Sequence, residues 1–171
     1  VTPVLTRAGA EFVTPLSVSA LAGEKVHEAL FDLTDEAEMG HIQLSRVADL
    51  IVIAPGTADL LAKMVQGRAD DLASTLLLAT DTRVLVAPAM NVRMWQHAAT
   101  QRNLAQARAD GVLFVGPNEG EMACGEFGPG RMAEPEEIMA AISAALSGGP
   151  LRGKHVLVTS GPTHEPIDPV R

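Results

Sequence analysis

The sequence predicts a three-layer α/β fold in which helices cover both faces of a parallel β-sheet. Apolar runs of strand length recur with little alternation between faces, as in buried parallel strands, at residues 1–5, 50–54, 84–87, 112–115 and 156–159. Segments with helical spacing lie between them, at residues 15–22, 41–48, 58–66, 71–79, 94–109 and 135–146. Alternation of this kind implies right-handed crossovers, which place helices on both sides of the sheet.

Taken in order, the predicted strands of the main domain each end at a turn of small or polar residues. The first ends before Thr6, the second enters PGT at 55–57, the third PAMN at 88–91, and the fourth GPN at 116–118. Ligands of open parallel sheets bind beyond the carboxyl ends of the strands. We therefore expect these four loops to line one crevice.

The chain divides into one main domain and the beginning of a second. Residues 1–147 form the main domain, and the Gly-rich, basic stretch 148–154 is expected to be a linker. A new strand at 155–159 opens a second unit that ends at residue 171, before it could bury a core. Because both ends look cut, we expect the chain to be a fragment.

Composition favours a small-molecule role in the cytoplasm. The net charge of -8 leaves no basic surplus for a nucleic-acid or anionic-membrane partner. The single cysteine, Cys124, cannot form an internal disulfide, and no leader of signal-peptide type is present. The apolar runs also fall short of the roughly 20 residues that span a bilayer.

Asn91 is the first candidate site residue. It lies in the segment 88–95, PAMNVRMW, which follows a strand and opens a helix. An amide beside the free N–H groups of a helix start suits an anion such as a carboxylate. The alternative is a plain helix cap at Asn91, with Met94 and Trp95 packed in the core.

The turn after the second strand and the helix start at His41 are further candidates. In the turn, small residues would let a flat ring approach the backbone, and Thr57 and Asp59 offer polar contacts, although a helix cap explains them too. His41 follows Gly40, and its imidazole could act as a base or hold an anion. A lone histidine at a helix start is more often structural.

Four glycines surround Cys124 in the segment 118–131. Such a segment is typical of a mobile flap that closes over a substrate, or of an ordinary surface loop with a small buried cysteine. No histidine is spaced from Cys124 as a zinc ligand would be, so we expect no metal site.

In this order, the motifs resemble those of the flavin-containing cysteine decarboxylases. They are GHI at 40–42, PGTAD at 55–59, PAMN at 88–91 with Met94 and Trp95, and ACG at 123–125 with GPGRM at 128–132. The tail GPTHEPIDPVR at 161–171 resembles the opening of phosphopantothenate-cysteine ligase, which is fused after the decarboxylase in bacterial bifunctional proteins. The resemblance implies a Rossmann-like, flavodoxin-like fold. It also implies that a strand and a Gly-rich turn precede residue 1.

The resemblance implies FMN-dependent decarboxylation of 4'-phosphopantothenoylcysteine to 4'-phosphopantetheine in coenzyme A biosynthesis. Oxidation of the thiol end to a thioaldehyde would provide the electron sink, and reduction after loss of carbon dioxide would give the product. Of the catalytic residues, His41 would place or deprotonate the thiol end, Asn91 bind the carboxylate, and Cys124 deliver a proton. Met94, Ala123 and Gly125 would contact the substrate. No ligase activity is expected from residues 155–171.

The resemblance also implies the flavin contacts and the assembly. Residues expected at the flavin are Thr6, Phe12, Pro55, Thr57, Ala58, Asp59 and Met90. A homo-oligomer is expected, as a trimer or a dodecamer, with the flavin at a subunit interface.

Several alternatives stay open. A peptide-cysteine decarboxylase and a flavin prenyltransferase share the fold and the flavin, but the ligase-like tail argues against both. A non-catalytic flavin-binding regulatory subunit would not need His41, Asn91 and Cys124 together. A nucleotide-binding α/β domain without flavin is the plainest alternative.

Overall fold

The computed structural model describes residues 1–29, 40–121 and 125–147 of the chain. Its central feature is a parallel sheet in the order β1-β2-β3, formed by β1 (Ile51–Gly56), β2 (Val84–Pro88) and β3 (Leu113–Phe114). Ile51 pairs with Val84, and Leu85 pairs with Leu113. All five residues of β2 are buried, as expected for a central strand covered on both faces.

The helices between the strands follow the sequence prediction with one exception. The structure forms α4 (Ala58–Gln66), α5 (Leu72–Ala79), α6 (Val92–Gln96), α7 (Ala98–Ala109) and α8 (Pro135–Leu146). The predicted single helix over 94–109 is wrong, because His97 has extended backbone angles that separate α6 from α7. Its ring nitrogen Nδ1 instead accepts a hydrogen bond from the Ala99 N–H and caps α7 (3.2 Å).

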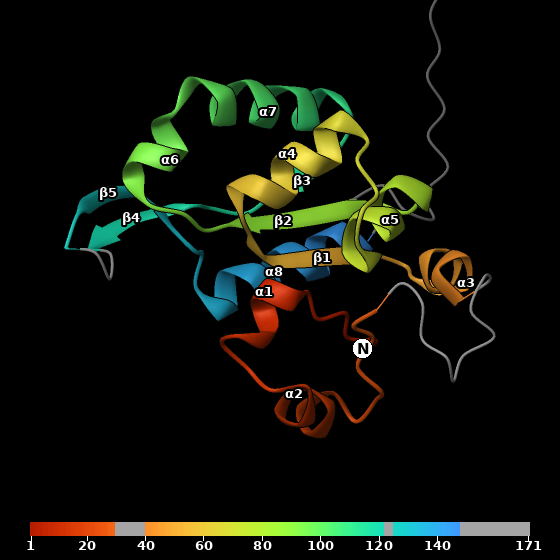
Figure 1. The fold of residues 1–171 in the computed structure, drawn as a ribbon. Coiled ribbons are helices and arrows are strands. Elements are labelled where there is room, and N and C mark those ends of the chain that lie inside the picture. The colour runs from red at the N-terminus through yellow and green to blue at the C-terminus, as the bar shows by residue number, and fades with distance from the viewer. Residues whose placement is uncertain (30–39, 122–124, 148–171) are drawn as a thin grey trace, which may run out of the picture.

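Two apolar clusters show the three predicted layers. On one face, Leu61 of α4 packs with Leu104 and Ala107 of α7, and with the half-buried Trp95 and Phe114. On the other face, the buried residues Ala87, Ala133 and Ile138 form a second cluster, which joins β2 to α8. Figure 1 shows α4 and α7 above the sheet and α8 on its other side. The predicted α/β class with helices on both faces is therefore confirmed.

Residues 1–29 do not form the predicted strand over 1–5. They contain α1 (Arg7–Ala10) and α2 (Pro15–Ala22), and their only β pairing among the described residues is an isolated parallel bridge between Val4 and His27. Pro3 has no N–H to donate, which limits the ladder on this side. Two hydrogen bonds hold this pairing. The Leu5 N–H donates to the His27 carbonyl (2.9 Å), and the His27 N–H donates to the Pro3 carbonyl (3.0 Å).

The Gly-rich segment 118–131 is a β-hairpin in its described part, which the sequence did not indicate. β4 (Asn118–Glu121) and β5 (Phe127–Arg131) pair antiparallel, with Gly120 opposite Gly128. Glycine in a strand often marks a place where another part of the protein approaches the backbone closely, because no side chain stands in the way. The predicted linker 148–154 and the strand 155–159 lie outside the described residues. Within the described ranges, no helix is long and apolar enough to cross a membrane.

Candidate functional site

The turns that follow β1 and β2 lie side by side, and we call residues 55–59 and 88–94 the paired turns. Gly56 pairs with Pro88 in the sheet, and the Ala89 N–H donates to the Gly56 carbonyl (3.0 Å). Both strands run toward the end of the sheet from which α4 and α6 start (Figure 1). The structure thus places these two predicted loops at the carboxyl end of the sheet, where ligands of such folds bind.

The first of the paired turns offers a surface of small groups. Pro55, Thr57 and Asp59 are exposed, and Ala58 is half-buried. Thr57 caps α4, because its Oγ1 accepts a hydrogen bond from the Leu60 N–H (3.2 Å). The hydroxyl proton of Thr57 stays available for a ligand, and no bulky side chain of this turn bars a flat ring from the backbone.

Asn91 caps α6, and this cap determines which of its amide atoms can bind a ligand. Its Oδ1 accepts a hydrogen bond from the Met94 N–H (2.8 Å). Because the oxygen is used in this way, the exposed side chain presents Nδ2, which can only donate. A donor at a helix start suits a carboxylate oxygen.

Met94 and Trp95 differ in burial, although the helix-cap alternative for Asn91 predicted that both would pack in the core. Trp95 packs against the cluster of Leu61 and Leu104, whereas Met94 is 46% exposed. Met94 therefore lies at the surface beside Asn91, where a ligand could contact it. The predicted core packing is therefore confirmed for Trp95 and wrong for Met94.

The hairpin is docked on the second of the paired turns at three places. The Met90 N–H donates to the Gly130 carbonyl (3.0 Å). Gly128 lies against Val92, and Arg93 Nε pairs with Glu126 Oε1 at 3.2 Å. These contacts carry the hairpin next to Asn91.

Of the site residues predicted between β4 and β5 in the sequence, the structure describes one. Gly125 is exposed and has a φ of 77°, in the left-handed region that favours glycine. Ala123 and Cys124 lie outside the described residues. The contacts that dock the hairpin were not found from the sequence, although its repeated glycines were a signal of close approach.

Gly128 is expected to be essential for this docking. A Cβ at this position would lie 3.1 Å from Val92 Cγ2, and the φ of 150° is one that L side chains rarely adopt. Gly128→Ala should therefore lower the free energy of unfolding by about 1–3 kcal/mol, through overpacking and backbone strain. Urea unfolding measures the change.

Gly111→Ala is the matched control for Gly128→Ala. Gly111 also has a positive φ, of 91°, but a Cβ there would meet open space. Only the strain of about 1 kcal/mol should remain. Equal losses in the two variants would show that the contact with Val92 contributes nothing.

The base of the hairpin is bonded to the start of α8. Asn118 Nδ2 donates to Glu137 Oε2 (2.6 Å), and the Glu134 N–H donates to the same oxygen (2.8 Å). Arg131 forms an ion pair with Glu134. The backbone hydrogen bond from Glu134 and then that from Asn118 hold the pKa of Glu137 below its ordinary value of 4.5.

This lowered pKa predicts a pH dependence of stability. A carboxyl with a lower pKa in the folded state stabilises the fold above its unfolded pKa, and the effect is lost as the pH falls through the folded pKa. Glu137→Gln should therefore show a smaller drop in Tm than the unmodified protein when the pH falls below 4.5. Glu136→Gln is the control in the same helical turn, and equal slopes in both variants would contradict the prediction.

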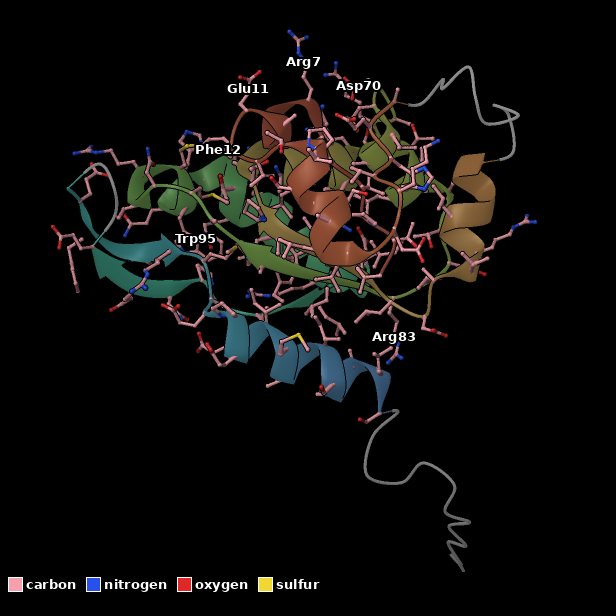
Figure 2. All side chains as sticks on the ribbon, turned by 90° about the horizontal axis from the view of Figure 1, so that it is seen from below. Arg7, Glu11, Phe12, Asp70, Arg83 and Trp95 are labelled. Atoms are coloured by element: carbon pink, nitrogen blue, oxygen red, sulfur yellow. The ribbon has the colours of Figure 1, made fainter. Side chains whose placement is uncertain are left out.

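Among the described residues, the hydrogen bonds of Thr6 and Phe12 stay within their own segment and do not reach the paired turns. Thr6 caps α1, its Oγ1 accepting from the Gly9 N–H (3.1 Å), and Phe12 is 90% exposed. Figure 2 shows Arg7 and Glu11 pointing outward, on the side of the molecule opposite α8. An exposed aromatic ring in this segment is available to a ligand or to another chain.

His41 lies in α3 (Gly40–Val47), at the other end of the sheet from Asn91. The Thr82 hydroxyl, just before β2, donates to the Ala48 carbonyl after α3 (3.1 Å), which ties this helix to the amino ends of the strands. Figure 1 shows α3 at one end of the sheet and α6 with the hairpin at the other. Within one chain the structure does not bring His41 and Asn91 together.

A charged network that the sequence analysis missed adjoins the first of the paired turns. Lys63 Nζ lies 3.4 Å from Asp59 Oδ2, 3.1 Å from Asp70 Oδ1 and 3.0 Å from Asp71 Oδ2. Hydrogen bonds to Asp71 and then Asp70 raise the pKa of Lys63 above its ordinary value. Part of this network could have been predicted from the sequence, because opposite charges four residues apart on a helix, as Asp59 and Lys63 are, lie on the same face.

Comparison with known proteins gives matches over nearly the whole chain. The flavoprotein family matches residues 1–147, and the family described as DNA/pantothenate metabolism flavoprotein C-terminal domain matches residues 151–171. The coenzyme A biosynthesis bifunctional protein CoaBC of Vibrio vulnificus is 49% identical over 98% of this chain and 42% of its own length. That of Escherichia coli K12 is 47% identical over 98% of this chain and 41% of its own length. The chain thus spans about two fifths of the length of these curated relatives.

Solved structures give the same fold. A mutant PPC decarboxylase complexed with pantothenoylaminoethenethiol has a TM-score of 0.74 and 30% identity, covering 85% of this chain and 82% of its own. The FMN-dependent cysteine decarboxylase SpaF has a TM-score of 0.71 and 34% identity, covering 85% of this chain and 77% of its own. The flavodoxin-like fold and the resemblance read from the motifs are confirmed, and the chain belongs to the flavoprotein family.

Proposed function

We propose that the chain catalyses the FMN-dependent decarboxylation of 4'-phosphopantothenoylcysteine to 4'-phosphopantetheine, a step of coenzyme A biosynthesis. The observation that carries the proposal is Asn91, whose amide is fixed as a donor at the carboxyl end of the sheet. The likeness to a PPC decarboxylase bound to pantothenoylaminoethenethiol supports this substrate class. The CoaBC relatives support the place in coenzyme A biosynthesis.

The cofactor of this flavoprotein is proposed to be FMN. Solved relatives include an FMN-dependent cysteine decarboxylase and the FMN binding protein AtHal3. The small exposed groups of the first paired turn fit a flat ring, and the proposed contacts are Thr6, Phe12, Pro55, Thr57, Ala58, Asp59 and Met90. When bound, the flavin supplies a two-electron acceptor that returns the same electrons, so that the net reaction is loss of carbon dioxide.

The chain's own residues would position the substrate and move its protons. Asn91 Nδ2 would hold the carboxylate that leaves, and the thioether of Met94 would contact the substrate beside it. Cys124, which lies in the sequence between β4 and β5, would deliver the proton that completes the product, and its neighbours Ala123 and Gly125 would contact the substrate. His41 would hold or deprotonate the thiol end.

A homo-oligomer is part of the proposal, as a trimer or a dodecamer. Two observations support it. His41 and Asn91 lie at opposite ends of the sheet within one chain, so a second copy would be needed to bring the two together. Phe12, Leu16 and Leu21 are large apolar side chains that are at least 80% exposed, as expected for a segment that contacts another chain.

The proposed domain division is a decarboxylase domain at 1–147, a linker at 148–154 and the start of a ligase domain at 155–171. The separate family matches at 1–147 and 151–171 support it. A cytoplasmic location is proposed on the metabolic role of the curated relatives.

The experiment that tests this function compares substrates. Purified full-length protein with FMN is offered 4'-phosphopantothenoylcysteine or, separately, a peptide with a carboxyl-terminal cysteine, and product masses are recorded. Loss of carbon dioxide from the first substrate alone supports the proposal. Turnover of the peptide alone would indicate a peptide-cysteine decarboxylase, and bound flavin without turnover of either would indicate another flavin-dependent activity or a regulatory subunit.

A further inference from the structure

We propose that Lys63 is a positioning residue for the flavin site, because it fixes and neutralises the carboxylate of Asp59 at the first of the paired turns. The inference rests on the proposed placement of the flavin at this turn. It assigns a role to a side chain that belongs to none of the recognised motifs.

Lys63 is enclosed by the turn on one side and by the start of α5 on the other. Its side chain is only 18% exposed, although lysine side chains usually extend into solvent. Asp59, by contrast, is 78% exposed at the first turn of α4. The half-buried Lys63 side chain therefore pairs, through its ammonium, with a carboxylate that is itself largely exposed to solvent.

The other two partners of Lys63 are structural. Asp71 caps α5, its Oδ1 accepting hydrogen bonds from the Ser74 N–H (2.7 Å) and the Ser74 hydroxyl (2.8 Å). Asp70 is also paired with Arg68 Nη2, at 2.8 Å. These contacts would hold the loop between α4 and α5 even if the turn had no ligand to bind. Asp59 is the single member of the network that lies within the proposed flavin site.

The charges of the network explain why the contact to Asp59 matters. Three carboxylates face two cations, Lys63 and Arg68, so the group already carries an excess of negative charge. Loss of Lys63 would leave Asp59 without a cation within 4 Å among the described residues. FMN carries an anionic phosphate, and a flavin that accepts electrons gains negative charge. An unpaired carboxylate at the turn would weaken the binding of both forms.

A double-mutant cycle separates this role from the structural one. FMN affinity is measured by quenching of flavin fluorescence in the full-length protein, for Lys63→Met, Asp59→Asn and the double variant. Lys63→Met should raise the Kd for FMN by about three- to tenfold and shift the flavin reduction potential to more negative values. Asp59→Asn removes the charge that Lys63 neutralises, so the second substitution should add nothing in that background.

Two further variants serve as controls. Lys63→Arg keeps the cation and should retain the Kd within about twofold. Asp70→Asn removes one carboxylate of the network outside the turn, and should lower Tm while leaving the Kd for FMN within about twofold. Raising the salt concentration should reduce the effect of Lys63→Met, since screening weakens a charge effect.

The inference is overturned if Lys63→Met leaves the Kd unchanged, or if its effect persists in full in the Asp59→Asn background. The second outcome would show that Lys63 acts through α5 and not through Asp59. If Lys63→Met does not fold, Lys63→Gln takes its place in the cycle under the same criteria. Unmodified protein that takes up no FMN would overturn the proposed function together with this inference, whereas the preceding outcomes overturn the inference alone.

Discussion

Asn91→Asp is expected to lower kcat/KM by about a thousandfold, which is roughly 4 kcal/mol of transition-state stabilisation. The aspartate would replace the only donor of the side chain by a second carboxylate oxygen and place it against the substrate carboxylate. The helix start should not suffer, because an aspartate oxygen can accept from the Met94 N–H as Oδ1 of Asn91 does. Steady-state kinetics with 4'-phosphopantothenoylcysteine measure the loss.

The cap makes Asn91→Ser a useful control for the same position. Serine also caps helices, but it carries no amide and no charge. This variant should keep the Tm within a few degrees and show a smaller loss of kcat/KM than Asn91→Asp, since no repulsion is added. Turnover by Asn91→Asp near the unmodified rate would remove Asn91 from the carboxylate site.

Cys124→Ser is expected to change the product and not only the rate. A thiol can release a proton near neutral pH, whereas a serine hydroxyl is a far weaker acid. Under anaerobic conditions the variant should still release carbon dioxide, but stop at the oxidised enethiol, one molecule per bound flavin. Mass spectrometry would then find a product lighter than 4'-phosphopantetheine by two hydrogens, with the missing electrons held by the flavin.

Cys124→Ala is the matched control for that experiment. It removes the hydroxyl as well, so both variants should accumulate the same oxidised product if the missing proton is the cause. Normal output of 4'-phosphopantetheine from Cys124→Ser would refute the role of Cys124 as the proton donor.

The fold and the paired turns could be predicted from the sequence because both depend on local patterns. Buried strands appear in the sequence as apolar runs. The turns after two of these strands contain Thr57 and Asn91, residue types that commonly cap helices, and both side chains do cap the helices that follow. The order of the motifs then indicated the family. Because the carboxyl ends of parallel strands meet at one edge of a sheet, the parallel topology also predicts that the two turns lie together.

Other features could not be predicted, because they depend on contacts between distant segments. The pairing of β4 with β5, including Gly120 with Gly128, and the close approach of Gly128 to Val92 are contacts that no local sequence pattern predicts. The break at His97 depends on its own backbone angles and its ring cap, and not on hydrophobic spacing. From the sequence, Lys63 looks like an ordinary exposed charge on an amphipathic helix. Its role depends on the loop at 70–71, which lies distant in sequence and contributes Asp70 and Asp71 as partners.

The most direct test of the central claim is an absorbance titration of the full-length protein, stripped of flavin and then reconstituted with FMN, followed by addition of 4'-phosphopantothenoylcysteine. The account predicts that bound-flavin bands appear on reconstitution, and that carbon dioxide and 4'-phosphopantetheine form only in the reconstituted sample. Folded protein that takes up no FMN, or that decarboxylates the substrate equally well without it, would contradict the account.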